Sequence, residues 1–425
     1  MKSFDGRALV LLSLNFWFMA CASYTDEVKQ VELSFRAGQY DDALKKLEDS
    51  GLKDQARNRL LYLLEKSMIF DRQGQKDEAR QLLMKADKVV DSLFTTSISS
   101  TAASFIYNDA MTEYSGEDYE KVAIHTVLAH SFLEEGKLNE ARVEAARINT
   151  KLNEINDGYE TNKNRYKEDA YARYLAGMIY EALGELDSAI IDYRSALRIY
   201  QGDYSKIFET RAPEHLITAL YRLLVKRNRS DEAKELMAQH KFLEPKLSSK
   251  EPFGEIVVLH EVGSIATKER KDFVLPIGRD IVRFSFPVIG HVKKSFDRTG
   301  IKIDEGSIES AEMAQNMDMI ARETLEDRRG RILIKSAARL ILKSQMRQKA
   351  EKELGPLGWL AGNIYGAITE TADTRSWTLL PAAIEVSRLE LKPGTYDLTV
   401  YNNGRTSRVR KIKLRAGAIE FVRDY

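Results

Sequence analysis

A turn residue followed five positions later by a small residue recurs along the first half of the chain. Glycine and asparagine take the positive φ that ends a helix, and a small residue early in the next helix lets two helix backbones approach closely. One helical hairpin cannot bury its apolar face alone, so the recurrence predicts a stacked array of hairpins. The pairs are Gly38/Ala43, Gly74/Ala79, Gly136/Ala141, Gly184/Ala189 and Asn228/Ala233.

The best-defined hairpin is predicted over Tyr171–Tyr200. Apolar residues recur there with the helical period of 3.6, and Gly184 stands where the first helix must end. Small and aromatic residues around a glycine turn resemble the tetratricopeptide repeat, although Arg173 stands where that repeat prefers Trp. An ordinary helical hairpin is the alternative. The predicted buried faces comprise Leu175, Met178, Ile179 and Ala182, and then Ala189, Ile190, Tyr193, Ala196 and Leu197.

The repeat pattern also predicts which side chains line the concave groove of the array. They are charged, aromatic and apolar, a mixture that suits a peptide or a protein segment. The alternative is that the second half of the same chain fills the groove. The predicted groove residues are Asp71, Arg72, Thr126, His130, Glu134, Tyr171, Tyr174, Met178 and Glu181.

Residues 1–20 predict a lipoprotein signal peptide. Lys2 and Arg7 precede an apolar run that is too short to span a bilayer comfortably. The sequence FMA before Cys21 resembles a bacterial lipobox, which implies acylation of the Cys21 thiol and a stable membrane anchor. Cys21 is the only cysteine in 425 residues, so an intramolecular disulfide is excluded. Ordinary secretion with an incidental Cys21 is the alternative.

The mature chain is predicted to be an α+β protein. Residues 21–242 form an α-solenoid of tetratricopeptide-like hairpins, 243–255 a linker, and 256–425 a mixed domain. Residues 255–260 and 281–289 are predicted to be strands, and Pro287 indicates that the second is an edge strand or ends early. The Asn-Gly turn at 403–404 predicts a terminal hairpin in a small antiparallel β-sandwich. One face of that sandwich comprises Leu389, Leu391, Tyr396, Leu398 and Val400.

Residues 307–354 are predicted to return to helix, and two patterns in and after this helix raise a membrane-active protein as an alternative. A basic residue recurs every four positions, which is interpreted first as a solvated helix face, with contact to anionic lipid headgroups or an acidic partner as the alternative. The glycines that follow suit close helix packing. The basic stripe is Arg331, Lys335, Arg339, Lys343 and Arg347, and the glycine run is Gly358, Gly362 and Gly366.

Charge and motifs argue against several function classes. The chain has 65 basic and 64 acidic residues, so no global field favours nucleic acid. The motifs GxSxG, HExxH and the P-loop do not occur, and no cysteine-based dyad is visible. His125 and His130 lie five positions apart, so they do not share a helix face as metal ligands do. We therefore expect no cofactor, no metal and no enzymatic activity.

The chain resembles a family of uncharacterised bacterial lipoproteins that carry helical repeats. The resemblance rests on the segments Tyr62–Gly74, Gly116–Ala145, Tyr166–Ala189 and Ala372–Leu389, and DTRSWTLLP in the last is the most distinctive. It covers nearly all of the mature chain and implies architecture and location, but no activity. Asp373, Arg375 and Trp377 in that motif are the residues to test for an enzyme site, and a structural contact is the alternative.

These observations together predict a membrane-anchored scaffold of the cell envelope. An acylated Cys21 followed by Ala22 suggests the outer membrane, with the protein facing the periplasm. The expected partner is an envelope protein or peptide held by the helical repeats. The alternatives are an enzyme with a site near Asp373–Trp377 and a membrane-active protein that uses the Gly358–Gly366 run.

Overall fold

The computed structural model describes most of the chain between Tyr24 and Tyr425. The described residues are 24–99, 112–159, 164–246, 253–277, 280–292, 299–330, 332, 372–402 and 405–425. The predictions made for the signal peptide, for Cys21, for the basic stripe from Arg331 to Arg347 and for the glycine run lie outside these residues.

Within the described residues, the five predicted hairpins are all present. At each turn the glycine or asparagine has a positive φ, between 58° at Asn228 and 81° at Gly74, and the alanine five positions later is buried. The prediction of a repeat array is confirmed. The helix pairs are α2 (Tyr24–Arg36) with α3 (Tyr40–Asp49), α4 (Arg59–Arg72) with α5 (Lys76–Ser99), α6 (Asp118–Glu134) with α7 (Leu138–Asp157), α8 (Ala170–Ala182) with α9 (Leu186–Ile199), and α11 (Glu214–Lys226) with α12 (Ser230–Gln239).

The central pair α8–α9 shows why small residues occur in the pattern. Gly177 faces the ring of Tyr193, and a Cβ at position 177 would overlap that ring. Tyr193 itself is fully buried between the helices, as are Leu175 and Ile190. The predicted buried faces are therefore confirmed, except that Ala182 is only partly buried. Short helical turns connect or follow the pairs: η1 (Leu52–Asp54), η2 (Ala56–Asn58), η5 (Tyr200–Tyr204), α10 (Ser205–Ile207) and η6 (Lys241–Lys246).

The second half forms three sheets among the described residues. A mixed sheet has the order β10-β1-β7-β6, in which β1 and β10 are parallel and the other neighbours antiparallel. An antiparallel sheet has the order β5-β4-β8-β9, and β2 and β3 form a separate hairpin. The strands are β1 (Gly254–Val262), β2 (Lys268–Ile277), β3 (Asp280–Ile289), β4 (Gly300–Ile303), β5 (Ile308–Ser310), β6 (Glu312–Asn316), β7 (Ala383–Leu391), β8 (Gly394–Asn402), β9 (Arg405–Leu414) and β10 (Ile419–Asp424).

The two four-stranded sheets pack face to face. Their shared apolar core contains Ile256 and Val258 of the mixed sheet and Leu398, Val400 and Ile412 of the other. The predicted β-sandwich and its terminal hairpin β8–β9 are confirmed. The helix predicted for residues 307–354 begins later than expected, because 308–310 and 312–316 are the strands β5 and β6, and a helix follows at 317–330.

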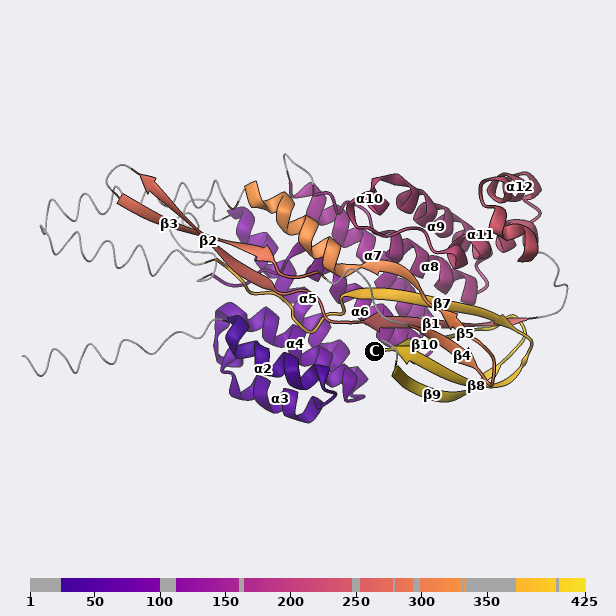
Figure 1. The fold of residues 1–425 in the computed structure, drawn as a ribbon, viewed down its shortest axis with the longest axis horizontal. Helices are drawn as coiled ribbons and strands as arrows, with labels where there is room; N and C mark the ends of the chain where they lie inside the picture. Colours follow the sequence, from indigo (N-terminus) through magenta and orange to yellow (C-terminus); the bar gives the residue numbers. More distant parts are fainter. Residues whose placement is uncertain are drawn as a thin grey trace, which may run out of the picture.

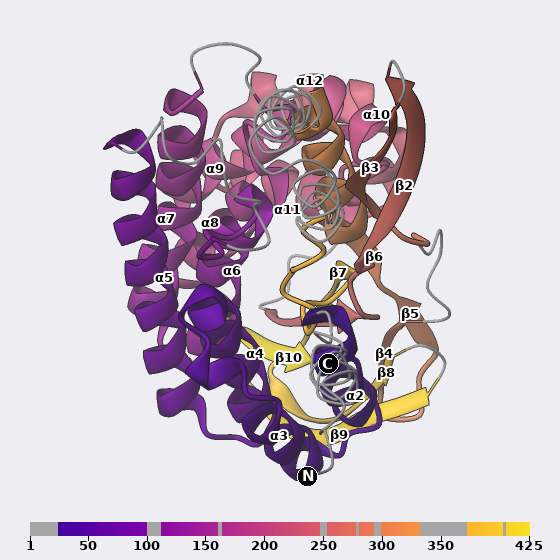
Figure 2. The same cartoon turned by 90° about the vertical axis from the view of Figure 1, so that its left-hand side faces the viewer.

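The mixed sheet lies between the sandwich core and the helices. Figure 2 shows α5, α7 and α9 on the outside of the array, with α6 and α8 between them and the strands β7 and β10. Along β1, residues alternate: Val257 and Leu259 join the core shared with the helices, whereas Ile256 and Val258 join the sandwich core. One face of the sheet therefore covers the inner side of the helical array.

Candidate functional site: the concave groove and the outer cleft

The predicted groove residues lie in the inner helices and are covered by the chain's own strands. Tyr171, Tyr174 and Met178 of α8 are fully buried, and Thr126 and His130 of α6 are nearly so. The contacts come from α4, α6 and α8 on one side and from β1, β7 and β10 on the other. Three polar clusters join the two sides.

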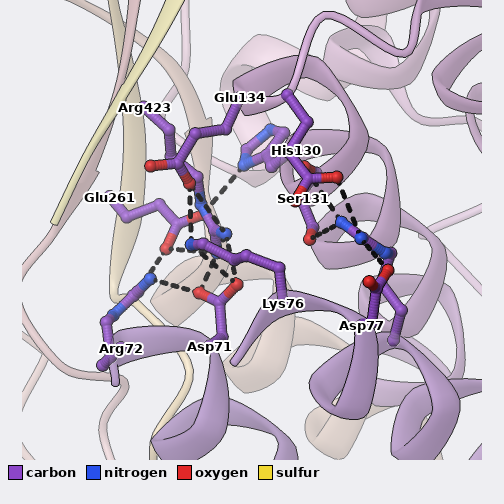
Figure 3. A network of polar contacts seen from close by, with 11 residues as sticks. Asp71, Arg72, Lys76, Asp77, His130, Ser131, Glu134, Glu261 and Arg423 are labelled. Carbon is purple, nitrogen blue, oxygen red and sulfur yellow. Dashed lines mark hydrogen bonds and ion pairs between the residues drawn. The ribbon is translucent and has the colours of Figure 1, made fainter. Parts of the chain in front are cut away.

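The first cluster surrounds Arg423 of β10 (Figure 3). Its guanidinium contacts Asp71 of α4 through Nη1 at 2.9 Å and Glu261 of β1 through Nε at 2.8 Å. Arg72 also reaches Glu261, at 2.5 Å. Lys76 lies 3.1 Å from Asp71 and 2.8 Å from Glu134, which is the third carboxylate of the cluster. Each carboxylate of the cluster therefore has at least one cationic partner.

Neighbouring cations stabilise the ionised form of the carboxylates in the first cluster. Burial would raise the pKa of Asp71, but Arg423, Arg72 and Lys76 outweigh burial and leave that pKa below its usual value. For the same reason the pKa of Glu261 lies well below its usual value, since Arg423 and Arg72 oppose its burial. Both carboxylates are therefore ionised around neutral pH.

His130 connects the first cluster to the buried tyrosines. Its Nδ1 lies 2.9 Å from Glu261 and its Nε2 2.6 Å from the Tyr171 hydroxyl. Burial lowers the pKa of His130 in spite of the nearby Glu261. A neutral imidazole has one donor and one acceptor, so we assign the Nδ1 proton as donated to Glu261 and Nε2 as accepting from Tyr171.

The second cluster joins α8 and α11 to the strands β1 and β7. Glu181 accepts from Arg388 at 2.5 Å, from Arg222 at 2.5 Å and from the Tyr193 hydroxyl at 2.7 Å. The same two arginines form ion pairs with Glu255 of β1. Burial would raise the pKa of Glu181, but Arg388 and Arg222 lower it to about 2.

The third cluster holds the DTRSW segment against the helices. Arg375 pairs with Asp373 at 2.8 Å and donates to the backbone carbonyls of Arg57 and Thr112, each at 3.0 Å. The Trp377 backbone N–H donates to Glu120 at 2.7 Å, and the Trp377 side chain is fully buried. The three motif residues thus connect this segment to the helical half, which agrees with the structural alternative for them.

Glu65 of α4 lies beside the same segment and differs from the other acidic groups. It accepts hydrogen bonds from the Thr378 backbone and hydroxyl at 2.7 and 2.9 Å, from Leu379 at 3.2 Å and from Tyr24 at 3.0 Å. No cation is among these partners, and burial raises the pKa of Glu65 to about 7.

The groove is therefore not an open surface in this structure. The side chains that the sequence placed along it contact β1, β7 and β10 or are buried beneath them, and this corrects the expectation of a groove open to a partner. The alternative, a groove filled by the second half of the chain, describes the structure. The sequence analysis missed the strand side of these contacts, whose main residues are Glu255, Glu261, Arg388 and Arg423.

A second surface feature remains accessible on the helical half. A cleft of about 410 Å³ lies between α9, α11 and α12. Leu220 and Leu224 belong to its apolar part, while Arg198 and Glu232, whose side chains are 63% and 46% exposed, belong to its charged part. The repeat pattern was used to predict residues on the concave side only. This cleft lies elsewhere, between the last described hairpin and the one before it.

Two further properties can be stated for the described residues alone. No group of three or more His, Cys, Asp or Glu side chains in them is arranged to hold a metal ion. None of their helices is both long enough and apolar enough to cross a membrane.

Known proteins resemble this chain in its helical repeats. Residues 170–203 match the family model of the tetratricopeptide repeat. Among solved structures, the repeats of a putative kinesin light chain from Podosopora anserina are 16% identical, with a TM-score of 0.33 over 55% of this chain and 100% of that one. MamA is 16% identical, with a TM-score of 0.31 over 51% and 95%.

The apo form of RapI is 12% identical, with a TM-score of 0.34 over 52% of this chain and 70% of RapI. These TM-scores are too low for conclusions about function. No curated protein matches the chain. The chain contains helical repeats similar to the tetratricopeptide repeat, with the clearest copy at residues 170–203.

Proposed function

We propose that this protein is a protein-binding scaffold of the bacterial cell envelope. It is held at the outer membrane by acyl chains on Cys21 and faces the periplasm. The observation that carries the scaffold role is the array of stacked helical hairpins, an architecture typical of protein interaction modules. The lipobox-like sequence before Cys21 supports the anchor.

The partner binds the outer surface of the helical array. The inner groove is occupied by β1, β7 and β10, and their displacement would break the ion pairs of Arg423 with Asp71 and of Arg388 with Glu181 and would expose the apolar core that the sheet shares with the helices. Each large apolar side chain that loses its burial costs roughly 1.5–3 kcal/mol. A partner that displaced the sheet would have to overcome several such costs, whereas the outer cleft is accessible at once.

The cleft between α9, α11 and α12 fits an amphipathic segment of an envelope protein. Leucines offer an apolar surface, and arginines and glutamates stand around it, so an apolar anchor and charges of both signs on the partner are matched. Its volume of about 410 Å³ holds one or two large side chains rather than a whole helix.

Site-specific photocrosslinking in intact cells tests the scaffold role. A photoreactive residue at Glu235, which lines the cleft, is expected to capture one envelope protein. The same residue at Ile308, which is 53% exposed on β5, serves as the matched control outside the array. Capture of the same protein from both positions, or of none from Glu235, would contradict binding at the cleft. Mass spectrometry of the mature N-terminal peptide tests the anchor separately.

A further inference from the structure

Two buried carboxylates of the helical half hold residues 376–379 of the second half. These residues belong to the stretch 372–382, which contains neither helix nor strand and leads into β7. In Figure 1 this stretch is the amber trace that runs between β2 and α4 toward β7. Glu65 comes from α4 and Glu120 from the first turn of α6, so two consecutive hairpins of the array contact one short piece of chain.

The two carboxylates accept hydrogen bonds from three consecutive backbone amides. The Trp377 N–H donates to Glu120 at 2.7 Å. The N–H groups of Thr378 and Leu379 donate to Glu65 at 2.7 and 3.2 Å. No helix or strand uses these amides, so their contacts with the two carboxylates protect them from exchange with water.

Neither carboxylate forms an ion pair with a described residue. Further neutral donors are present instead: the hydroxyls of Thr378 and Tyr24 reach Glu65 at 2.9 and 3.0 Å, and the Tyr114 hydroxyl reaches Glu120 at 2.7 Å. Both carboxylates are fully buried. A carboxylate that leaves water without gaining a cation favours its protonated form, so burial raises the pKa of Glu120 and raises that of Glu65 to about 7.

The cations near this site are paired with other acids. Burial outweighs the opposing effect of Lys268 on the pKa of Glu120, and Lys268 itself forms an ion pair with Glu117. Arg375, in the same stretch of chain, pairs with Asp373 at 2.8 Å. These pairs leave the two buried carboxylates without a cation of their own.

The other titratable groups around the two carboxylates keep one charge state near neutral pH. Burial raises the pKa of each neighbouring tyrosine well above its usual value, so the hydroxyls stay protonated. Burial would raise the pKa of Glu117, but Arg328 and Lys268 lower it to about 2, so Glu117 stays ionised. A change from pH 5 to pH 8 therefore acts on this site through Glu65 and Glu120. The tyrosines are Tyr24 of α2, Tyr114 before α6 and Tyr119 of α6.

Residues 376–379 are held imperfectly between two firmer contacts. The Trp377 side chain is fully buried, yet its indole N–H and the Ser376 hydroxyl have no hydrogen-bond partner among the described residues, which is unfavourable for buried polar groups. On one side Arg375 donates to two backbone carbonyls of the helical half, each at 3.0 Å. On the other side the Leu380 carbonyl accepts a backbone hydrogen bond at 2.9 Å. Residues 376–379 can therefore leave the helices while both flanking contacts remain.

We propose that residues 376–379 are a pH-controlled latch, docked on α4 and α6 when Glu65 and Glu120 are protonated and released locally when they ionise. The released Glu65 faces water and has its ordinary pKa of 4.5, whereas the docked Glu65 has a pKa of about 7. Release therefore frees a proton between these values, so the equilibrium constant for release rises with pH and levels off above pH 7. Release uncovers both carboxylates and the space of the Trp377 side chain on the inner side of the array. This control of the inner groove is separate from binding at the outer cleft.

Hydrogen exchange of the purified full-length chain, resolved to single amides, tests the latch. The protection factor of an amide is its exchange rate in an unfolded peptide at the same pH divided by its rate in the protein. For residues 377–379 it should fall roughly 40-fold from pH 5 to pH 7 and less than about twofold from pH 7 to pH 8, as pKa values of 4.5 and about 7 require. The amides of Val258 and Leu259 in the central strand β1 should be more protected at each pH.

A matched pair of variants assigns the effect to its carboxylate. Glu65→Gln mimics the protonated carboxyl group and should remove most of the change with pH. Glu309→Gln makes the same substitution at an exposed position of β5 and should leave the change intact.

Three results would overturn the proposal. Equal protection factors at residues 377–379 and at Val258 and Leu259 would mean that only global unfolding releases the stretch. Protection factors that stay constant from pH 5 to pH 8 would mean that no carboxylate controls it. A full pH response in the Glu65→Gln protein would assign the control to another group. The first two results come from the unsubstituted chain, so they do not require that a variant folds, and none of the three depends on the partner of the outer cleft.

Discussion

The two faces of strand β1 make different kinds of contact. Toward the sandwich, Ile256 and Val258 pack into an apolar core. Toward the helices, Val257 and Leu259 are flanked by Glu255 and Glu261, which are ion-paired with arginines. Apolar packing is non-directional, whereas each buried ion pair requires one geometry. We infer that the sandwich face mainly supplies stability and that the groove face also fixes where the sheet lies on the helices.

The largest effect is expected for a change that breaks the groove face. Arg423→Met leaves the carboxylates of Asp71 and Glu261 buried with fewer partners, so it should lower the free energy of unfolding by about 3–5 kcal/mol. Urea unfolding measures this loss. Lys413→Met, on the exposed side of β9, is the control and should change it little. Equal effects of the two changes would contradict the comparison.

A slightly smaller loss is expected on the sandwich face. Ile256→Ala removes buried methyl groups and leaves a cavity, at a cost of roughly 2–5 kcal/mol. Because no charge is involved, the loss should be the same in low and high salt and across neutral pH. A loss that changed with salt or across neutral pH would show that the two faces are not distinct.

The DTRSW motif allows a third comparison, between a structural ion pair that stabilises the fold and a functional site. Asp373→Ala removes the partner of the Arg375 guanidinium, and hydrogen bonds to charged groups contribute roughly 1.5–3 kcal/mol. Asp397→Ala, at an exposed pair with Lys411, is the matched control and should cost less than about 1 kcal/mol. Normal stability of the Asp373→Ala protein, combined with loss of its function in cells, would instead support a site.

The smallest effect, counted per pH unit, is a slope of the free energy of unfolding with pH. The pKa of Glu65 is raised from 4.5 to about 7 in the folded state, so folding takes up a proton between these values. Stability contributed by Glu65 is therefore complete below pH 4.5 and is lost as the pH rises toward 7, by at most about 1.4 kcal/mol per pH unit. Glu65→Gln should remove this slope in urea unfolding measured from pH 5 to 8.

The paired acids should show the opposite sign at lower pH. The pKa of Glu181 is lowered to about 2, as is that of Glu117, whose burial is outweighed by Arg328 and Lys268. Their contribution is present above pH 4.5 and is lost as the pH falls toward 2. If Glu65→Gln also removed the loss below pH 4.5, this assignment of the slopes would be wrong.

The sequence predicted what short-range patterns encode. Turn glycines and the alanines that follow them located every described hairpin, because both act within one turn of a helix. The strand β2 was missed, since KERKDFVLPI does not alternate. The filled groove could not be predicted either. Asp71 and Arg423 are 352 positions apart, and no local sequence pattern around either residue predicts the other as its partner.

One signal of the groove contacts was nevertheless present. Glu255 and Glu261 are six positions apart on either side of an apolar run, so a strand places both on one face together with Val257 and Leu259. Two acids on the same face as buried aliphatic residues require buried cations. The identity of those cations, Arg388, Arg423 and the helical arginines, depends on tertiary structure alone.

The separation of Asp71 and Arg423 in the sequence also sets a delay between the synthesis of the two residues on the ribosome. Ribosomes add about 5–20 residues per second, so Arg423 follows Asp71 by roughly 20–70 s. Throughout that interval Asp71 lacks its partner Arg423, and the sheet that covers the helices lacks β10. A newly made chain therefore offers a groove that the finished protein lacks, and a chaperone can hold the inner side of the helices only before β10 arrives.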